Sequence, residues 1–197
     1  MMIRFYLFLF ICGLCSCSSD LAPAEYINYV RNPENGLAKE VAIGETLIGI
    51  QYEPQDYLAL KELRRSNFTK EDIEKMRTHF SDYFYFKLDL TSNENVFFSG
   101  IDSTTRNFYD RQLKFHLSEY LFLIDNGDTL KCLMSQLDNT GGIGDKYSFA
   151  MIFEKKNLSA EGNIEFLFID KFSLTGREKV SILLSKGDLL SVPSLKI

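Results

Sequence analysis

Tryptophan is absent from the sequence, and histidine occurs only twice, at His79 and His116. The two histidines lie 116 − 79 = 37 positions apart, with no cysteines or paired carboxylates nearby at ligand spacing. Tetrahedral zinc sites need such a set of ligands, so the sequence predicts no metal site. His79 ends a predicted helix, where a basic side chain suits the helix dipole, and His116 alternates with apolar neighbours in a predicted strand. Both histidines therefore have a structural interpretation.

The usual signatures of hydrolases and nucleotide-binding proteins are also missing. No serine stands in a Gly-x-Ser-x-Gly elbow, and no Ser-x-x-Lys falls on a helical pattern. The glycine-rich segment 141–144 lacks the Lys-Ser/Thr pair of a phosphate-binding loop and is predicted to be a loop between strands. The net charge of −5 argues against a nucleic-acid partner. No catalytic or cofactor-binding residue is predicted.

Only one long apolar run occurs, at the N-terminus, where Arg4 precedes the uncharged segment 5–14. A helix of about ten residues spans roughly 15 Å, half of the ~30 Å hydrocarbon core, so this run suits a signal peptide better than a membrane span. It ends in Leu14-Cys15-Ser16-Cys17, which resembles the lipobox of bacterial lipoproteins. We therefore interpret residues 1–16 as a lipoprotein signal peptide and Cys17 as the lipidated N-terminus of the mature chain.

Two other cysteines compete with Cys17 for this role. Cys12 follows Ile11 and Cys15 follows Leu14, whereas a signal peptidase that requires a small residue before the cysteine is served only by Ser16. Cys17 is therefore preferred. The alternative is an ordinary secretory peptide cleaved within 18–24, which would leave an unlipidated periplasmic protein.

The mature chain is expected to contain a tether over 17–24 and a single β-rich domain over 25–197. Loss of Arg4 with the signal peptide makes the net charge 21 − 27 = −6. Cys132 is then the only cysteine left in the body of the domain, so no intrachain disulfide is expected. Because Cys132 lies in an apolar stretch, we interpret it as a small buried hydrophobic residue.

The pattern of the first half predicts a hairpin followed by two helices. The runs 37–43 and 46–52 are rich in apolar and β-branched residues and flank Gly44-Glu45, which favours a turn. Pro54 opens a helical pattern, and Thr69 to Asp72 has the spacing of a capping box that opens the second helix. A short helix over 25–30 is also expected.

The second half predicts mainly strands. Residues 82–90 alternate between a phenylalanine and leucine face, expected in the core, and a face that carries Tyr83 and Tyr85. We expect the two helices to cover the tyrosine face, the alternative being an exposed platform for a sugar or peptide. Asn126-Gly127 favours a type I′ turn between strands at 112–124 and 128–137. A loop is expected over 93–107, with a short strand over 96–98, and further strands are expected over 146–154, 163–170 and 178–185.

These patterns together predict a mostly β (α+β) fold, an antiparallel β-sandwich or open barrel with two short helices inserted after the first hairpin. The segments 33–37, 51–54 with 57–60, and 123–130 resemble those of lipoproteins of similar length from Bacteroidota that have no assigned activity. This resemblance implies a Gram-negative cell and hence the outer membrane. Because Asp20 is the only acidic residue close behind Cys17, we expect the protein to face the periplasm.

The sequence therefore predicts an envelope lipoprotein anchored in the membrane through the lipid on Cys17. It favours a non-enzymatic binding or accessory module with an envelope protein as a possible partner. The alternative function is an envelope hydrolase whose site is assembled from the loops 93–107 and 138–145.

Overall fold

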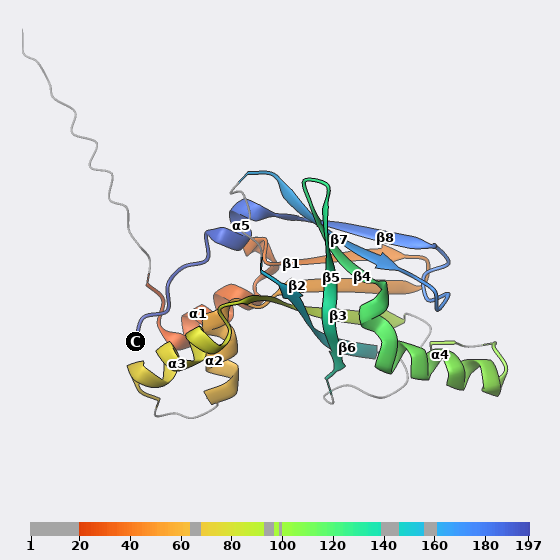
Figure 1. Cartoon of the computed structure of the whole chain (residues 1–197), viewed down its shortest axis with the longest axis horizontal. Coiled ribbons are helices and arrows are strands. Elements are labelled where there is room, and N and C mark those ends of the chain that lie inside the picture. Colours follow the sequence, from red (N-terminus) through yellow and green to blue (C-terminus); the bar gives the residue numbers. More distant parts are fainter. Residues whose placement is uncertain (1–19, 64–67, 93–96, 99, 139–145, 156–160) are drawn as a thin grey trace, which may run out of the picture.

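The computed structural model describes residues 20–63, 68–92, 97–98, 100–138, 146–155 and 161–197. Its centre is an eight-stranded antiparallel sheet that curls into a nearly closed barrel (Figure 1). The strand order is β1-β2-β3-β6-β5-β4-β7-β8, so that β1 and β8 are the two edges. The strands are β1 (Ala38–Ile43), β2 (Thr46–Tyr52), β3 (Tyr83–Ser92), β4 (Leu121–Asp125), β5 (Asp128–Leu137), β6 (Lys146–Glu154), β7 (Asn163–Ile169) and β8 (Lys179–Ser185).

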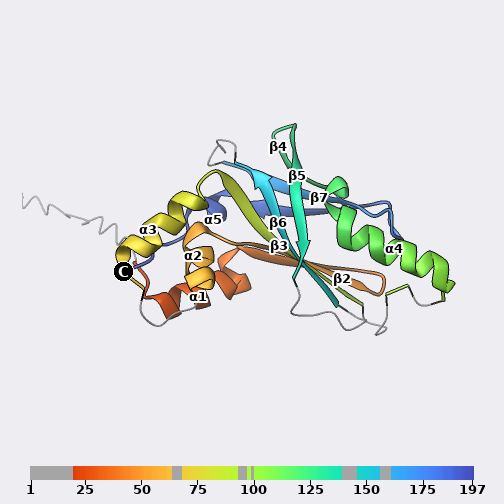
Figure 2. The same cartoon turned by 60° about the horizontal axis from the view of Figure 1, so that its bottom comes forward.

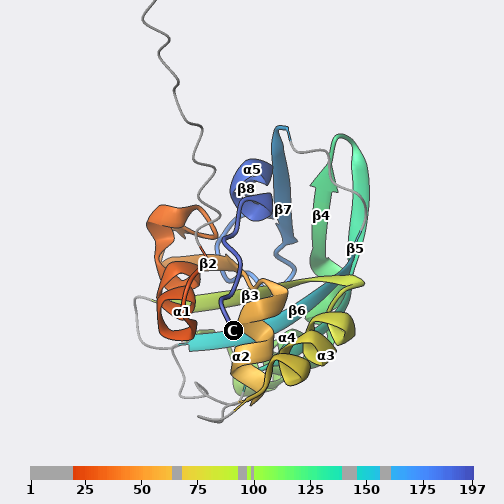
Figure 3. The same ribbon diagram turned by 90° about the vertical axis from the view of Figure 1, so that its left-hand side faces the viewer.

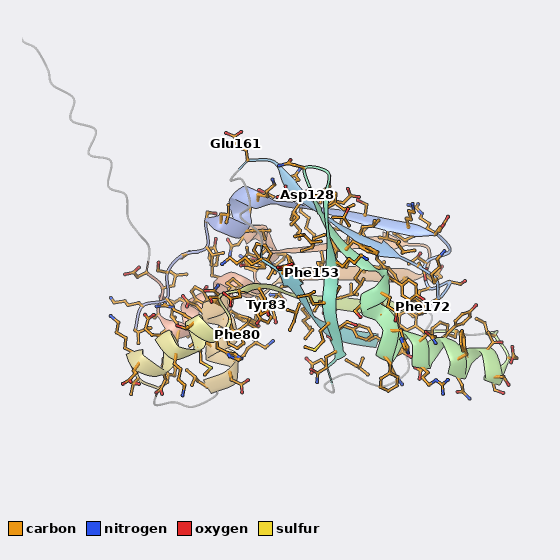
Figure 4. All side chains as sticks on the ribbon, in the orientation of Figure 1. Phe80, Tyr83, Asp128, Phe153, Glu161 and Phe172 are labelled. Carbon is orange, nitrogen blue, oxygen red and sulfur yellow. The ribbon has the colours of Figure 1, made fainter. Side chains whose placement is uncertain are left out.

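The inside of the barrel is filled with apolar side chains from alternate positions of the strands. In β3, Phe84, Phe86, Leu88 and Leu90 are buried, as the alternation predicts. The ring of Phe86 meets that of Phe153 from β6 edge-on at 5.9 Å, and Figure 4 places Phe153 in the middle of the barrel. This packing makes the interior a hydrophobic core.

Helices cover both ends of the barrel, as Figures 2 and 3 show. At one end lie α1 (Pro23–Arg31), α2 (Gln55–Leu63) and α3 (Lys70–His79), whose buried side chains include Tyr26, Tyr57 and Ile73. At the other end lies α4 (Ser103–His116), followed by the 3₁₀ helix η2 (Leu117–Tyr120). Two shorter elements, the 3₁₀ helix η1 (Pro33–Asn35) and α5 (Lys186–Leu190), adjoin the first end.

The predicted fold class is confirmed, as are several local features. β1 and β2 form the expected hairpin, and α2 and α3 follow it. The Thr69 side chain accepts a hydrogen bond from the Asp72 backbone N–H, which completes the capping box. Asn126 and Gly127 adopt φ angles of 50° and 92° in the turn between β4 and β5, as a type I′ turn requires. Cys132 is buried, as expected.

The strand predicted over 112–124 is wrong in its first half. Residues up to His116 belong to α4, residues 117–120 to η2, and β4 begins only at Leu121. The residues 103–107 of the predicted loop also belong to α4. His116 therefore ends a helix and does not lie in a strand; its Nδ1 atom is 3.0 Å from Glu119 Oε1.

The two ends of the described chain meet beside α2 and α3. Leu21 donates its backbone N–H to Ser194 and accepts a hydrogen bond from Lys196, at 2.9 and 2.8 Å. Asp56 of α2 accepts two hydrogen bonds from the Arg77 guanidinium of α3 and a third from the Leu195 backbone. The hydrogen bonding to Asp56 also raises the pKa of the Arg77 guanidinium above its ordinary value. This end of the barrel is therefore fixed to Leu21, which lies within the range 17–24 predicted as a tether, and α1 begins within the same range, at Pro23.

None of the helices in the described ranges is long and apolar enough to cross a membrane. Cys17, residues 1–16 and the segment 139–145 lie outside the described residues.

Candidate functional site

The outer face of β1, β2 and β3 carries a groove that continues along α1 and α2. It consists of two adjoining hollows of about 340 and 610 Å³ that share Arg31, Gln51 and Lys87. We call this feature the outer groove. The smaller hollow lies over β1 to β3, and the larger one lies against α2. Their other lining residues include Lys39, Glu40, Gly49 and Asp89 in the first, and Ile27, Glu53, Tyr57, Leu60, Lys61 and Asp138 in the second.

Strand register explains how these residues meet. Glu40 of β1 pairs with Gly49 of β2, which pairs in turn with Asp89 of β3. Two residues further along β2, Gln51 lies opposite Lys87 of β3 on the same outward face. Because antiparallel pairing sets these rows directly beside each other, polar residues that lie far apart in the sequence form the floor of one groove.

Gly49 lies in the floor of the smaller hollow and has no side chain. A Cβ atom added there would lie 3.5 Å from Glu40 Cγ, 3.5 Å from Glu40 Oε1 and 3.7 Å from Asp89 Cβ, all ordinary contact distances. Its backbone does not lie in the left-handed region that requires glycine. Glycine weakens a strand interior and often marks a bulge, a tight bend or a place where a ligand or another backbone approaches closely. The strand register is regular at Gly49, so no bulge lies there. Neither the backbone nor the packing of the fold requires glycine at this position.

Asp89 is the most highly connected carboxylate of the groove. Ser148 Oγ donates a hydrogen bond to its Oδ1 atom, and Lys87 Nζ donates another to Oδ2 at 2.9 Å. Lys146 Nζ lies 3.5 Å from the same Oδ2. Burial opposes ionisation of Asp89, but these hydrogen bonds and the two lysine charges hold its pKa below the ordinary value. Asp89 is therefore a fixed anion.

Aromatic and charged side chains from the helices form the wall of the larger hollow. Arg31, at the end of α1, donates from Nε to the Tyr57 hydroxyl at 3.1 Å, and its guanidinium lies 6.0 Å from the centre of the Tyr57 ring. Lys61 Nζ lies 5.5 Å from the same ring and 2.8 Å from the buried carboxylate of Glu53. The two nearby cations and the hydrogen bond to the hydroxyl hold Tyr57 in place.

A second polar cluster joins α4 to β6. The Tyr147 hydroxyl donates to Asp110 at 2.6 Å, and Lys114 donates to the other oxygen of Asp110 at 2.7 Å. Burial and the hydrogen bond to Asp110 raise the pKa of Tyr147, so that its phenol stays protonated. The ring of Tyr147 lies 5.3 Å from that of Phe97. This cluster holds α4 against the end of the barrel.

The tyrosines of β3 are only partly covered by a helix. Phe80, which caps α3, meets Tyr85 edge-on at 5.3 Å, while Tyr83 remains 39% exposed. Figure 4 shows Phe80 and Tyr83 near each other, between the helical end and the barrel. The most exposed large apolar side chains among the described residues lie elsewhere: Phe108 and Phe115 on α4, with exposed fractions of 52% and 71%, Leu133 on β5 with 56%, and Leu190 on α5 with 52%.

The alternative hydrolase site was predicted in two loops, and about half of their residues lie outside the part of the chain that the structure describes. Of the loops 93–107 and 138–145, it describes 97–98, 100–107 and Asp138. Within the described ranges, no group of three or more histidine, cysteine, aspartate or glutamate side chains could hold a metal ion. Sequence reasoning also missed the outer groove; the signal that could have indicated it is Gly49 inside a strand pattern.

No protein family, curated protein or solved structure matches this chain. The resemblance to Bacteroidota lipoproteins therefore stays a prediction from the sequence segments alone.

Proposed function

We propose that this chain is a lipid-anchored, non-enzymatic binding module of the cell envelope that holds its ligand in the outer groove. The observation that carries the proposal is the floor at Gly49, where neither backbone nor packing needs a glycine, between polar residues of three strands. Lys87 and Asp89 already neutralise each other, as do Lys61 and Glu53. Such paired, fixed charges suit recognition, since their positions do not depend on the ligand.

The anchor is proposed at Cys17, in the outer membrane and facing the periplasm. Three peptide steps separate Cys17 from Asp20, so the chain can extend at most about 11 Å between them. The described chain then enters the end of the barrel that carries α1 to α3, where Leu21 pairs with Leu195. A lipid on Cys17 would therefore keep this end close to the bilayer and direct α4 away from it.

Metabolic labelling with palmitate tests the anchor. The wild-type chain should be labelled and cleaved, whereas Cys17→Ala should remain an unlabelled precursor. Labelling that survives in Cys17→Ala would contradict the assignment of Cys17 and would indicate that Cys15 or Cys12 carries the lipid. Protease treatment of intact cells tests the leaflet, since loss of the protein would contradict a periplasmic position.

Native mass spectrometry of the full protein, extracted from cells in detergent, tests the groove. The variant Gly49→Val fills the floor, and Ala42→Val places a valine at the next outward position of β1 after Glu40, a position that does not itself line the groove. We expect a bound low-mass ligand on the wild type and on Ala42→Val, and its loss from Gly49→Val. A ligand retained by all three proteins, or bound by none, would contradict the proposal.

The exposed aromatic side chains of α4 favour a second candidate function, the docking of an envelope protein. Phe108 and Phe115 expose more than half of their surface, and apolar surface of this kind is common in protein interfaces. Crosslinking from position 115 in intact cells tests this function. A specific crosslinked partner that is lost in Phe108→Ser would support this function. The absence of any crosslink would exclude this face of α4 as a docking surface.

A further inference from the structure

The charges of the smaller hollow indicate the kind of ligand it takes. Within the part of the chain that the structure describes, the Arg31 guanidinium contacts Tyr57 but no carboxylate. Glu40 likewise has no cationic partner among the described residues. Lys87 and Asp89 on the floor form an ion pair at 2.9 Å. Among the described residues, the hollow therefore presents two cations, Arg31 and Lys39, and one anion, Glu40, that form no ion pair.

The Glu40 carboxylate is directed over the floor of the hollow. Its Oε1 atom lies 3.5 Å from the position that a Cβ of Gly49 would take, and Asp89 Cβ lies 3.7 Å from the same point on the other side. Two carboxylates thus flank Gly49, and both nearby lysines, Lys87 and Lys146, pair with Asp89 and not with Glu40. A group with positive charge and several N–H donors, such as an ammonium, suits this place.

Arg31 supplies the opposite charge. Its Nε atom is used by the Tyr57 hydroxyl, and Tyr57 is itself buried, so the guanidinium is held at the junction of the two hollows. The N–H groups at the other edge of a guanidinium can form a bidentate pair with a carboxylate. Lys39 lines the same hollow and adds a second positive charge near it.

The volume limits the size of the ligand. Sites for small ligands span roughly 300 to 1,000 Å³, and the smaller hollow, at about 340 Å³, lies at the lower end of this range. A folded protein would not enter it, but one or two amino-acid residues would.

We propose that the outer groove binds a short zwitterionic peptide, with the ligand ammonium beside Glu40 over Gly49 and the ligand carboxylate at Arg31. This inference rests on the proposed function of the groove and specifies its ligand class. A ligand without ionised groups would pair with neither Arg31 nor Glu40, and a ligand with charges of only one sign would pair with only one of them. Recognition of both termini also limits the ligand to a short length.

The experiment uses the detergent-extracted full protein and Gly-Xaa dipeptides that cover every side chain, each with an N-acetylated and a C-amidated counterpart. The readout is the thermal unfolding midpoint, followed by titration calorimetry of every dipeptide that raises it. At least one free-ended dipeptide should raise the midpoint of the wild type and of Ala42→Val, and its blocked counterparts should not. Glu40→Gln and Arg31→Gln should each weaken binding at least about tenfold, and Gly49→Val should abolish it.

Equal shifts from free and blocked dipeptides, or no shift from any free dipeptide, would overturn the proposed ligand class. These outcomes differ from failure of the groove itself, because the mass-spectrometric comparison of Gly49→Val with Ala42→Val does not depend on the identity of the ligand. If no dipeptide binds, but Gly49→Val still lacks the ligand that is extracted with the wild type, the groove binds a ligand of another chemical class. If both experiments fail, the proposed function is wrong as well.

Discussion

The Nζ atom of Lys186 lies 2.6 Å from Oδ1 of Asp125, and the Lys186 side chain is completely buried. Lys186 begins α5 directly after β8, and its backbone N–H donates to Gly162 just before β7. Asp125 ends β4. The ion pair and the backbone hydrogen bond of Lys186 together therefore connect the ends of three neighbouring strands, β4, β7 and β8.

Replacement of Lys186 by Met should lower the free energy of unfolding by about 3 kcal/mol, because it leaves the largely buried Asp125 carboxylate without this cation. Urea denaturation measures the change. The double variant Lys186→Met/Asp125→Leu should recover part of the loss. Lys171→Met is the control, since Lys171 and Glu178 form an exposed pair at 3.7 Å, and its effect should stay within about 0.5 kcal/mol. Equal effects of the two single variants would contradict a structural role for the buried pair.

Asp89 should make stability depend on pH in the acid range. Its pKa in the folded state lies below the ordinary value of 3.8, so the unfolded chain binds the proton more readily. The stabilisation is thus fully present above 3.8 and is lost as the pH falls through the lower, folded-state pKa. Unfolding free energies measured from about pH 6 to pH 2 should converge for the wild type and Asp89→Asn at the acid end. A difference independent of pH would contradict the ionic role of Asp89.

Two glycines should respond in opposite ways to replacement by alanine. Gly49→Ala should raise the free energy of unfolding by about 0.5 kcal/mol, because its backbone is ordinary and its Cβ has room. Gly36→Ala should lower it by at least about 1 kcal/mol, since Gly36 has a φ of 73° and a Cβ there would lie 2.1 Å from Asp188 Oδ2. Thermal unfolding of both variants measures this contrast. A destabilised Gly49→Ala would mean that the fold itself requires this glycine.

Cys132 should be inert in the folded protein. Burial raises the pKa of its thiol to about 11, so little reactive thiolate forms at neutral pH. Iodoacetamide labelling, followed by mass spectrometry of the peptide that contains Cys132, should be slow in buffer and fast in denaturant. Rapid labelling of the native protein would show that this part of β5 opens readily.

Local sequence patterns predicted those parts of the fold that depend on contacts between residues close together in the chain. The alternation around Phe86, the turn at Asn126-Gly127 and the capping box at Thr69 each depend on a few adjacent residues. In α4 the same kind of evidence was misleading. Leu113, Phe115 and Leu117 alternate with polar residues as a strand would, but Leu113 and Leu117 are buried while Phe115 is 71% exposed. Spacing by four residues, together with the cap at Asp102, indicates a helix.

The outer groove could not be predicted in this way, because its floor depends on strand register. Glu40, Gly49 and Asp89 become neighbours only when β1, β2 and β3 pair with one particular alignment, and Arg31 arrives from α1. A shift of one residue in any of these strands would turn the side chains to the other face. What the sequence does contain is the glycine inside an otherwise regular strand.

Amide hydrogen exchange tests most directly whether the outer groove is the binding site. The full protein is compared with and without a low-mass extract of the cell envelope, and Gly49→Val is treated in parallel. Ligand binding should slow exchange in β1 and β2 of the wild type, around Glu40 and Gly49, and leave the variant unchanged. Protection confined to α4, or equal protection in Gly49→Val, would show that binding takes place elsewhere on the molecule.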